Sequence, residues 1–380
     1  MTANPPLLVA TPPARPGMRV DEITTPALLL ELSEFDRNLA RVTDALAGSG
    51  VRLRPHGKAH KCVEIARRQI AHGAVGLCCQ TVSEAEIFIR GGITDVLVTN
   101  QVLGRAKLEC LARLARVAKV GICVDQAENI RSLQEAAASA GTSLDVYVEV
   151  NVGMNRCGVE PGGPVLVLAE AIARCRNLQF RGLQAYHGAA QHLRKPAERA
   201  QAIDDAVAKV KITQTRLEQR GLRAEVVTGA GTGTWALEAA SGAYNEIQPG
   251  SYVFMDADYG RNCDQRGQPV AEFGQSLFVL TTVISCPSAN RAVVDAGLKA
   301  HSVDSGLPLV ANLPGTSYVK ATDEHGIIAM TGNAKLRTGH KIRLIPGHCD
   351  PTVNLYDWIV GLRHDVVETV WPVAARGAFY

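Results

Sequence analysis

Between residues 51 and 254, short apolar runs alternate with amphipathic stretches that have the spacing of helices. Strands that are apolar on both faces and are separated by helices are typical of a parallel sheet with covered faces. Eight such runs occur, near Leu53 and at residues 76–80, 95–100, 120–125, 145–150, 180–186, 224–229 and 244–254. The helical stretches include residues 106–118, 128–140, 164–174 and 198–218. This repeat predicts an α/β fold of the (β/α)8 TIM barrel type.

The pattern changes after residue 258, where β-rich segments follow one another without long helices. They lie at residues 276–284, 291–295, 341–345, 358–363 and 366–371. An antiparallel β-domain is the natural interpretation. We therefore expect a flexible N-terminal arm at 1–20, a barrel at 21–257 and a β-domain at 258–380. A ninth apolar run at 27–32 is surplus to the barrel, and we assign it to the β-domain or to the lead-in of the barrel.

Charge and hydropathy limit the partners that we expect. Forty Lys and Arg stand against 37 Asp and Glu, and no basic block is present, so a nucleic acid is not an expected partner and small molecules are. No apolar run reaches the ~18 residues that a membrane helix needs. The first twenty residues lack a secretory pattern, so we expect a cytoplasmic protein. Ten scattered cysteines without a CxxC pair indicate reduced thiols.

The segment at residues 51–61 (VRLRPHGKAHK) places a lysine directly after a predicted strand. The strand pattern breaks at Pro55 and Gly57, and Lys58 follows. Catalytic groups gather at the carboxyl ends of barrel strands, and a partly desolvated ammonium loses its proton more readily. Lys58 is therefore a candidate for Schiff-base chemistry. A solvated surface charge is the alternative.

A glycine-rich run, TGAGTGT at residues 228–234, follows the seventh predicted strand. Such a run exposes backbone N–H groups that can surround a phosphate. Barrels often bind phosphate on the loops after the seventh and eighth strands. The run is neither a Walker loop nor a dinucleotide fingerprint, and a tight strand-to-helix turn is the alternative.

Two further loops on the same side of the barrel carry candidate residues. Arg156 follows the strand at 145–150 and could hold a phenolate or carboxylate of a cofactor, or pair with a neighbouring acid. Tyr186 and His187 end the next strand, and His192 lies further along that loop. An aromatic ring and imidazoles there could stack on a ligand and move a proton, although Tyr186 could equally pack in the wall.

The segment PGHCDPTVN at residues 346–354 places His348 and Asp350 two positions apart in the β-domain. In an extended chain both side chains would leave on one face, and Cys349 on the other. A histidine and a carboxylate with open positions suit a divalent ion such as Mn²⁺ or Mg²⁺. A hydrogen-bonded turn is the alternative.

Taken together, these motifs resemble the D-threonine aldolase and D-serine dehydratase family, whose barrel is similar to the N-terminal domain of alanine racemase. The resemblance runs from about residue 22 to the end. It implies a fold-type III enzyme with pyridoxal 5'-phosphate carried by Lys58, Arg156 at the phenolic oxygen and Tyr186 on the pyridine ring. The other cofactor contacts that it implies are Thr228, Gly229, Gly231, Thr232, Ser251 and Tyr252.

Within that family, the metal motif separates two branches. The dehydratases show His-x-Cys with zinc, whereas His348 and Asp350 match the His-x-Asp pattern of the metal-dependent aldolases. Segments 295–299, 302–308, 323–326 and 375–377 also resemble the aldolases, particularly those acting on β-hydroxyaspartate. The resemblance thus implies a lyase that cleaves D-3-hydroxy-α-amino acids, of the D-threonine type, to glycine and an aldehyde. His192 would take the proton of the β-hydroxyl.

Several alternatives remain at this point. They are a β-hydroxyaspartate aldolase that gives glycine and glyoxylate, a D-serine or 3-hydroxyaspartate dehydratase, and a non-catalytic pyridoxal-phosphate-binding barrel protein. A racemase would need a second base, for which Tyr259 is the one candidate. A homodimer would fit the family.

Overall fold

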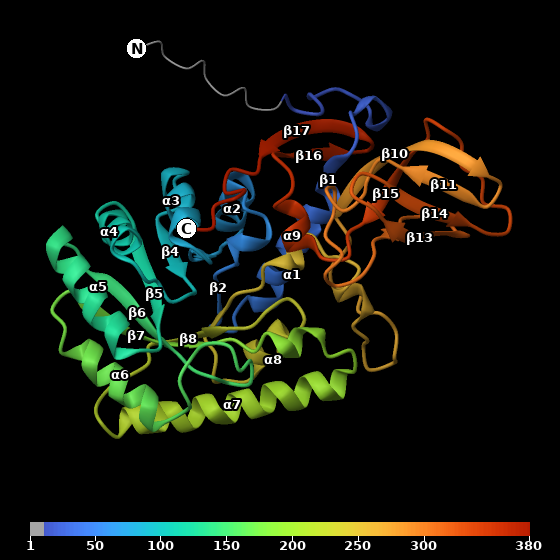
Figure 1. Cartoon of the computed structure of the whole chain (residues 1–380). Helices are drawn as coiled ribbons and strands as arrows, with labels where there is room; N and C mark the ends of the chain where they lie inside the picture. The colour runs from blue at the N-terminus through green and yellow to red at the C-terminus, as the bar shows by residue number, and fades with distance from the viewer. Residues whose placement is uncertain (1–10) are drawn as a thin grey trace, which may run out of the picture.

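The computed structural model describes residues 11–380, and Figure 1 shows two sheets side by side, a barrel and a β-domain. The eight strands of the first sheet are all parallel, in the order β2-β9-β8-β7-β6-β5-β4-β3. They are β2 (Arg52–Leu53), β3 (Leu77–Cys79), β4 (Asp95–Val98), β5 (Lys119–Val124), β6 (Leu144–Glu149), β7 (Leu178–Ala185), β8 (Val226–Gly229) and β9 (Glu246–Ile247).

Hydrogen bonds between the two edges of this sheet, at β2 and β3, close it into a barrel. Val75 N donates to Leu53 O at 2.9 Å, and Cys78 N donates to Pro55 O at 2.8 Å. The chain segment after β2 therefore pairs with the segment around β3. The predicted α/β barrel is confirmed.

A helix follows each strand from β2 to β8. These helices are α2 (Val63–Ala71), α3 (Val82–Arg90), α4 (Arg105–Leu114), α5 (Ala127–Ala140), α6 (Gly163–Ala173), α7 (Pro196–Glu218) and α8 (Trp235–Ala240). The place of an eighth helix is taken by α1 (Leu32–Leu46), which precedes β2 and packs against β2 and the turn Ser251–Val253 after β9. Phe35, Leu39 and Val42 are buried along one face of α1, at the spacing of an amphipathic helix.

The β-domain is built on a sheet in the order β13-β14-β11-β10-β1-β16-β17, with β15 paired to β10 and to β12. Its strands are β1 (Ala27–Glu31), β10 (Leu277–Ser288), β11 (Arg291–Val294), β12 (Leu309–Val310), β13 (Thr316–Ala321), β14 (Gly326–Met330), β15 (Lys341–Ile345), β16 (Trp358–Arg363) and β17 (Val366–Pro372). The surplus run at 27–32 is thus β1, which is antiparallel to β10 and parallel to β16. Every other pair in this sheet is antiparallel.

Residues 17–20 lie beside the start of β17, and residues 1–10 of the expected arm fall outside the described residues. Gly17 N donates to Val367 O at 2.8 Å, and Val367 N donates to Met18 O at 2.8 Å. Backbone hydrogen bonds therefore hold the last residues of the expected arm. Within residues 11–380 no helix is long and apolar enough to cross a membrane, and all ten cysteines are free thiols.

One loop of the β-domain crosses to the carboxyl ends of the barrel strands. Ala257 N donates to Pro346 O at 2.9 Å, and Cys349 N donates to Asp256 Oδ2 at 2.8 Å. A Cβ at Gly347 would lie 2.0 Å from Gly306 O, so this crossing needs a glycine. The short helix α9 (Cys349–Val353) then packs against the turn Gly57–Ala59 that carries Lys58.

Candidate active site

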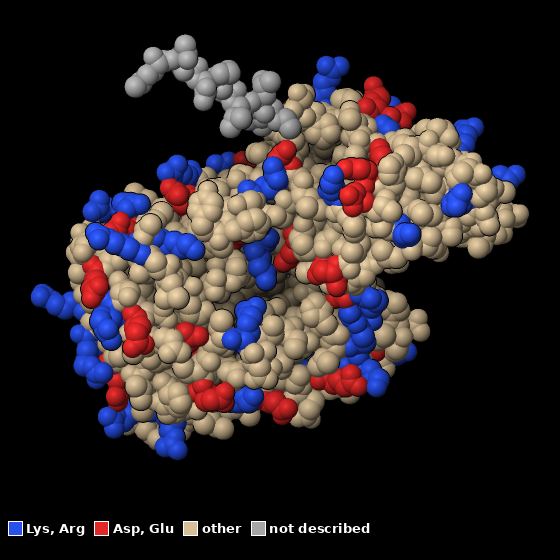
Figure 2. Space-filling view, in the orientation of Figure 1, with Lys and Arg blue, Asp and Glu red and all other residues tan. Residues whose placement is uncertain are grey.

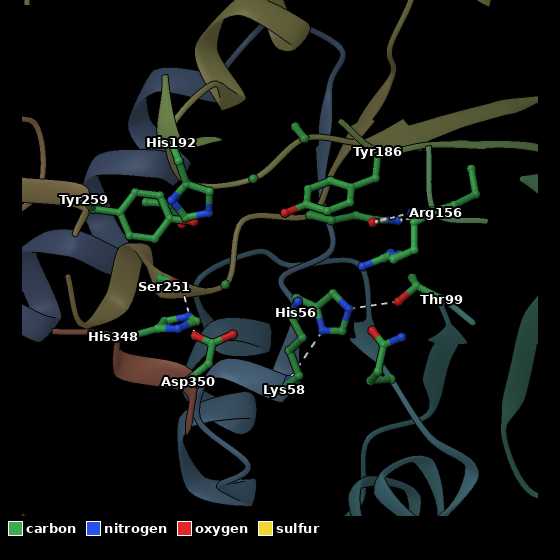
Figure 3. Close-up of a pocket in the computed structure, with 17 residues that line it drawn as sticks. His56, Lys58, Thr99, Arg156, Tyr186, His192, Ser251, Tyr259, His348 and Asp350 are labelled. Carbon is green, nitrogen blue, oxygen red and sulfur yellow. Dashed lines mark hydrogen bonds between the residues drawn. The ribbon is translucent and has the colours of Figure 1, made fainter. Parts of the chain in front are cut away.

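A cavity lies at the carboxyl ends of the barrel strands, where the β-domain meets the barrel. Figure 2 shows a hollow between the two domains and a mixture of positive and negative side chains over the visible face. Nine of the predicted site residues line the cavity: Lys58, Arg156, Tyr186, His192, Gly231, Thr232, Ser251, His348 and Asp350. In Figure 3, His192, His348 and Asp350 lie on one side of Lys58, and Arg156 lies on the other side. Residues 290 positions apart in sequence therefore share one site.

Lys58 is held by a hydrogen-bonded chain that runs through His56. Lys58 N donates to His56 Nδ1 at 3.4 Å, and His56 Nε2 lies 2.8 Å from Thr99 Oγ1. Burial, with the nearby ammonium of Lys58, lowers the pKa of His56 well below its ordinary value, so the ring is neutral. Because Nδ1 accepts, Nε2 carries the proton and donates to Thr99. The lysine turn is thus fixed to the end of β4.

The glycine-rich loop after β8 is fixed by Gln191. Gly233 N donates to Gln191 Oε1 at 2.9 Å, and Gln191 Nε2 donates to Thr234 Oγ1 at 2.7 Å. A Cβ at Gly231 would lie 2.6 Å from Gln191 Oε1, so the backbone approaches closely here. The buried Thr232 Oγ1 has no hydrogen-bond partner within residues 11–380. A buried hydroxyl normally has a partner, so this atom indicates a bound polar group.

Three of the expected cofactor contacts do not line the cavity. Thr228 Oγ1 accepts from Gln248 Nε2 at 2.8 Å inside the barrel. A Cβ at Gly229 would lie 2.3 Å from Ala185 O, which indicates strand packing. The Tyr252 hydroxyl accepts from Gln69 Nε2 at 3.3 Å, and its ring lies 5.7 Å from that of Phe273. The structure therefore gives these three residues structural positions.

Eight other residues line the cavity, and among them only Tyr259 had been considered, as a possible base of a racemase. They are His56, Gln80, Thr99, Gln184, Ala230, Gln248, Gly250 and Tyr259. Gln184, near the end of β7, and Gln248, directly after β9, hydrogen-bond to each other, since Gln184 Nε2 donates to Gln248 Oε1 at 3.0 Å and Gln248 Nε2 donates to Gln184 Oε1 at 2.9 Å. Polar residues at the ends of apolar strands are the signal that could have found most of them. His187, by contrast, is absent from the lining and lies against the loop at Gly153.

His192 ends a short turn (Ala189–His192) after β7 and lies beside an aromatic ring. Its Nδ1 is 2.5 Å from Asp258 Oδ2, and its ring centroid is 5.9 Å from that of Tyr259. Burial raises the pKa of Tyr259 well above its ordinary value, so this phenol stays protonated and is a poor base.

His348 and Asp350 reach the cavity from a helix start. His348 is extended (φ −143°, ψ 123°), but Cys349 begins α9 and Asp350 lies in its first turn. The expectation that an extended chain places the two on one face is therefore wrong, because the chain turns between them. Cys349 is fully buried and does not line the cavity. Burial raises the pKa of its thiol well above the ordinary value.

Hydrogen bonds orient both members of this pair. Asp304 Oδ2 lies 2.8 Å from His348 Nδ1, and Ser251 Oγ donates to Asp350 Oδ1 at 3.2 Å. Although burial opposes its protonation, the carboxylates of Asp350 and Asp304 raise the pKa of His348 above its ordinary value. A site with this excess of carboxylate attracts cations. Within the described residues, no cluster of three or more His, Cys, Asp or Glu side chains could hold a metal ion.

Comparison with known proteins places the chain in a family. Residues 30–258 match the model of the alanine racemase N-terminal domain, and residues 276–362 match a putative serine dehydratase domain. The chain is 49% identical to a 3-hydroxy-D-aspartate aldolase of Paracoccus denitrificans over 97% of this chain and 96% of the relative. It is 45% identical to a D-threonine aldolase of Arthrobacter over 96% of each chain.

A solved structure is similar throughout. The crystal structure of D-threonine aldolase from Filomicrobium marinum superimposes with a TM-score of 0.95 at 47% identity, covering 97% of this chain and 100% of that one. Sequence and structure therefore agree over both domains. The chain belongs to the family of the alanine racemase N-terminal domain, in the group that contains the D-threonine and 3-hydroxy-D-aspartate aldolases.

Proposed function

We propose that this protein is a lyase that cleaves D-3-hydroxy-α-amino acids of the D-threonine type to glycine and an aldehyde, with pyridoxal 5'-phosphate and a divalent metal ion. The observation that carries the proposal is that Lys58, His192 and the His348–Asp350 pair face one cavity. The aldolases named above, at 45% and 49% identity, support the same reaction class. We propose the D configuration of the substrate because both relatives are named for D-amino acids.

The cavity residues fit pyridoxal phosphate. The unpartnered Thr232 Oγ1 and the adjacent Gly231 backbone suit its phosphate. Lys58 would carry the cofactor, Tyr186 would pack on its ring, and Arg156 would meet its phenolic oxygen. When bound, pyridoxal phosphate supplies an electron sink for the bond that breaks at Cα.

The His348–Asp350 pair fits a divalent ion such as Mn²⁺ or Mg²⁺. Because Asp304 occupies Nδ1 of His348, Nε2 is the nitrogen that remains for a metal. Two protein ligands leave positions for water or substrate, and a bound ion would supply Lewis-acid polarisation of the substrate hydroxyl. The buried, protonated Cys349 stays outside this set.

The chain's own residues then have separate tasks. His192 takes the proton of the β-hydroxyl at Nε2 as the Cα–Cβ bond breaks. Tyr186 and Arg156 lie on the side of the cavity away from His348, where they would hold the pyridine ring of the cofactor. The β-domain loop at 346–350 brings His348 and Asp350 to the cavity wall. The reverse sequence of proton movements would permit aldol addition of glycine to an aldehyde.

An Asp304→Asn variant is expected to bind Mn²⁺ about 10- to 100-fold more weakly, the usual effect of losing a carboxylate that orients a metal-binding histidine. Free Mn²⁺ can be counted by its electron paramagnetic resonance signal during a titration of the cofactor-loaded protein. The control is Asp323→Asn, on an exposed β-domain turn. Unchanged Mn²⁺ affinity in Asp304→Asn would show that this carboxylate does not orient a metal ligand.

Chelation tests the proposed function directly. Protein treated with EDTA should keep its visible cofactor absorbance but release glycine from D-threonine about 10² to 10³ times more slowly, because several kcal/mol of charge stabilisation are lost. Added Mn²⁺ should restore the rate. Full activity without metal would remove the ion from the proposal, and the L isomer serves as the stereochemical control.

Product analysis separates the alternative activities. A 3-hydroxyaspartate aldolase gives glycine and glyoxylate, and the 49% identical relative favours testing that substrate beside D-threonine. A dehydratase gives a keto acid and ammonia. A non-catalytic pyridoxal-phosphate-binding protein gives no product, although it would hold the cofactor. Glycine with the matching aldehyde therefore identifies the proposed reaction.

We also propose that the protein acts as a cytoplasmic homodimer on a small amino acid, without a nucleic acid or membrane partner. The mixed charge on the face shown in Figure 2 supports the absence of a nucleic acid partner. Sedimentation of the cofactor-loaded protein measures the oligomeric state.

A further inference from the structure

Asp258 is a buried carboxylate outside the cavity lining that contacts the proposed base. Its Oδ2 lies 2.5 Å from His192 Nδ1, and its side chain is only 5% exposed. Arg194 Nη2 donates to Asp258 Oδ1 at 2.5 Å, and Arg261 Nη2 donates to the same oxygen. Two guanidinium groups thus fix Oδ1 of Asp258, and its Oδ2 is directed at the imidazole of His192.

The charge state of Asp258 follows from these contacts. Although burial alone would favour the neutral acid, hydrogen bonds from Arg194 and His192 lower the pKa of Asp258 below its ordinary value. An ionised carboxylate only accepts hydrogen bonds. His192 must therefore place a proton on Nδ1, which leaves the lone pair of a neutral ring on Nε2.

The backbone of Asp258 also connects the base to the His348–Asp350 loop. Asp258 N donates to Gly347 O at 3.2 Å, and Asp256 Oδ2 accepts from Cys349 N at 2.8 Å. Arg194 Nη1 donates to Asp258 O at 2.7 Å and to Asn262 Oδ1 at 2.8 Å. The segment 256–258 therefore links His192 to the His348–Asp350 loop.

We infer that Asp258 is a positioning residue that sets the tautomer and orientation of His192, so that Nε2 faces the substrate hydroxyl as a proton acceptor. The inference rests on the proposed function of His192. In the proton transfer, the hydroxyl proton moves to Nε2 and the electron pair of the O–H bond stays on the substrate oxygen. The imidazolium keeps its proton on Nδ1, where it is hydrogen-bonded to Asp258. The carboxylate stabilises this cation without taking a proton.

Asp258→Asn is the sharpest variant, because it keeps the size and removes the charge. Arg194 and Arg261 offer only donors, so the amide oxygen should face them and the amide nitrogen should face His192. Two N–H groups cannot bond to each other. His192 is then expected to move its proton from Nδ1 to Nε2 and lose its lone pair at the cavity.

The test measures both the tautomer and the kinetics of cofactor- and Mn²⁺-loaded protein. Asp258→Asn should lower kcat for D-threonine about 10²- to 10³-fold and leave KM within a few-fold. ¹⁵N-histidine spectra, with His192 assigned by comparison with His192→Asn, should show the Nδ1-protonated tautomer in the native protein and the Nε2-protonated one in Asp258→Asn. The matched control is Asp264→Asn. In the native protein, one carboxylate oxygen of Asp264 accepts hydrogen bonds from two backbone amides.

Two results would overturn the inference: a native kcat in Asp258→Asn, or an unchanged tautomer. The His192→Asn variant separates this inference from the proposed function. If His192→Asn retains turnover, the base in the proposed function is wrong, while the spectra still decide whether Asp258 sets the tautomer. If His192→Asn is inactive and Asp258→Asn is not, only the positioning role falls.

Discussion

Replacement of Lys58 by alanine is expected to remove covalently held pyridoxal phosphate and to lower the rate of glycine release by about 10⁴-fold or more, the scale seen when a covalent catalytic group is deleted. Lys58 lies in the cavity with Arg156, Tyr186 and Thr232, and its turn is fixed through His56 and Thr99. The visible absorbance of the purified protein measures cofactor attachment. Borohydride reduction followed by peptide mass spectrometry identifies the lysine that carries it.

Lys61 provides the matched comparison, three residues further along the same segment. Its Nζ donates to Glu84 Oε1 at 2.6 Å and is buried, so this ammonium already has a fixed partner. Lys61→Met should therefore keep the visible absorbance and lower the thermal midpoint. A reduced cofactor found on the Lys61 peptide, or absorbance retained in Lys58→Ala, would contradict the assignment of Lys58.

The barrel could be predicted because its signal is local. Each strand is a short apolar run, and a helix with its own periodicity follows most of them. The β-domain was harder to predict. Most residues of β13 are polar or exposed, β14 is a run of only five residues, and both strands were missed. The partners of β1 could not be predicted, because its pairing with β10 and β16 joins segments about 250 or more residues apart.

Residues that line the cavity could be predicted where a residue type is itself unusual after a strand, as for Lys58 and His192. The direction of a side chain could not be predicted from the sequence. Tyr252 follows the last barrel strand beside Ser251, yet Ser251 lines the cavity and Tyr252 packs on Phe273. Sequence also could not show that Asp258 contacts His192, because 66 residues separate them. That contact depends on how two loops fold over the same end of the barrel.

Replacement of Glu246 by alanine is expected to destabilise the barrel by about 3–5 kcal/mol, because it leaves a buried guanidinium without its main partner. Arg54, the residue after β2, is 3% exposed, and its Nε donates to Glu246 Oε1 on β9 at 3.0 Å. Its Nη1 donates to Asp95 Oδ1 at 2.7 Å. Glu246 and Asp95 are the first residues of β9 and β4, at the amino ends of the strands, whereas Lys58 lies at the carboxyl ends. Urea unfolding should therefore shift while the cofactor absorbance of the folded protein persists.

The control is a carboxylate whose ion pair is exposed. Glu109 contacts Arg105 on the surface of α4, and Glu109→Ala should leave the urea midpoint unchanged. An Arg54→Met, Glu246→Leu double variant should regain most of the stability lost in Glu246→Ala, since apolar side chains of similar volume remove the unpaired charge. If the double variant were no more stable than Glu246→Ala, the loss would come from packing of the β2–β9 pair. Pairing of β2 with β9 would then depend on shape at this position, and the buried charges would only specify which strands pair.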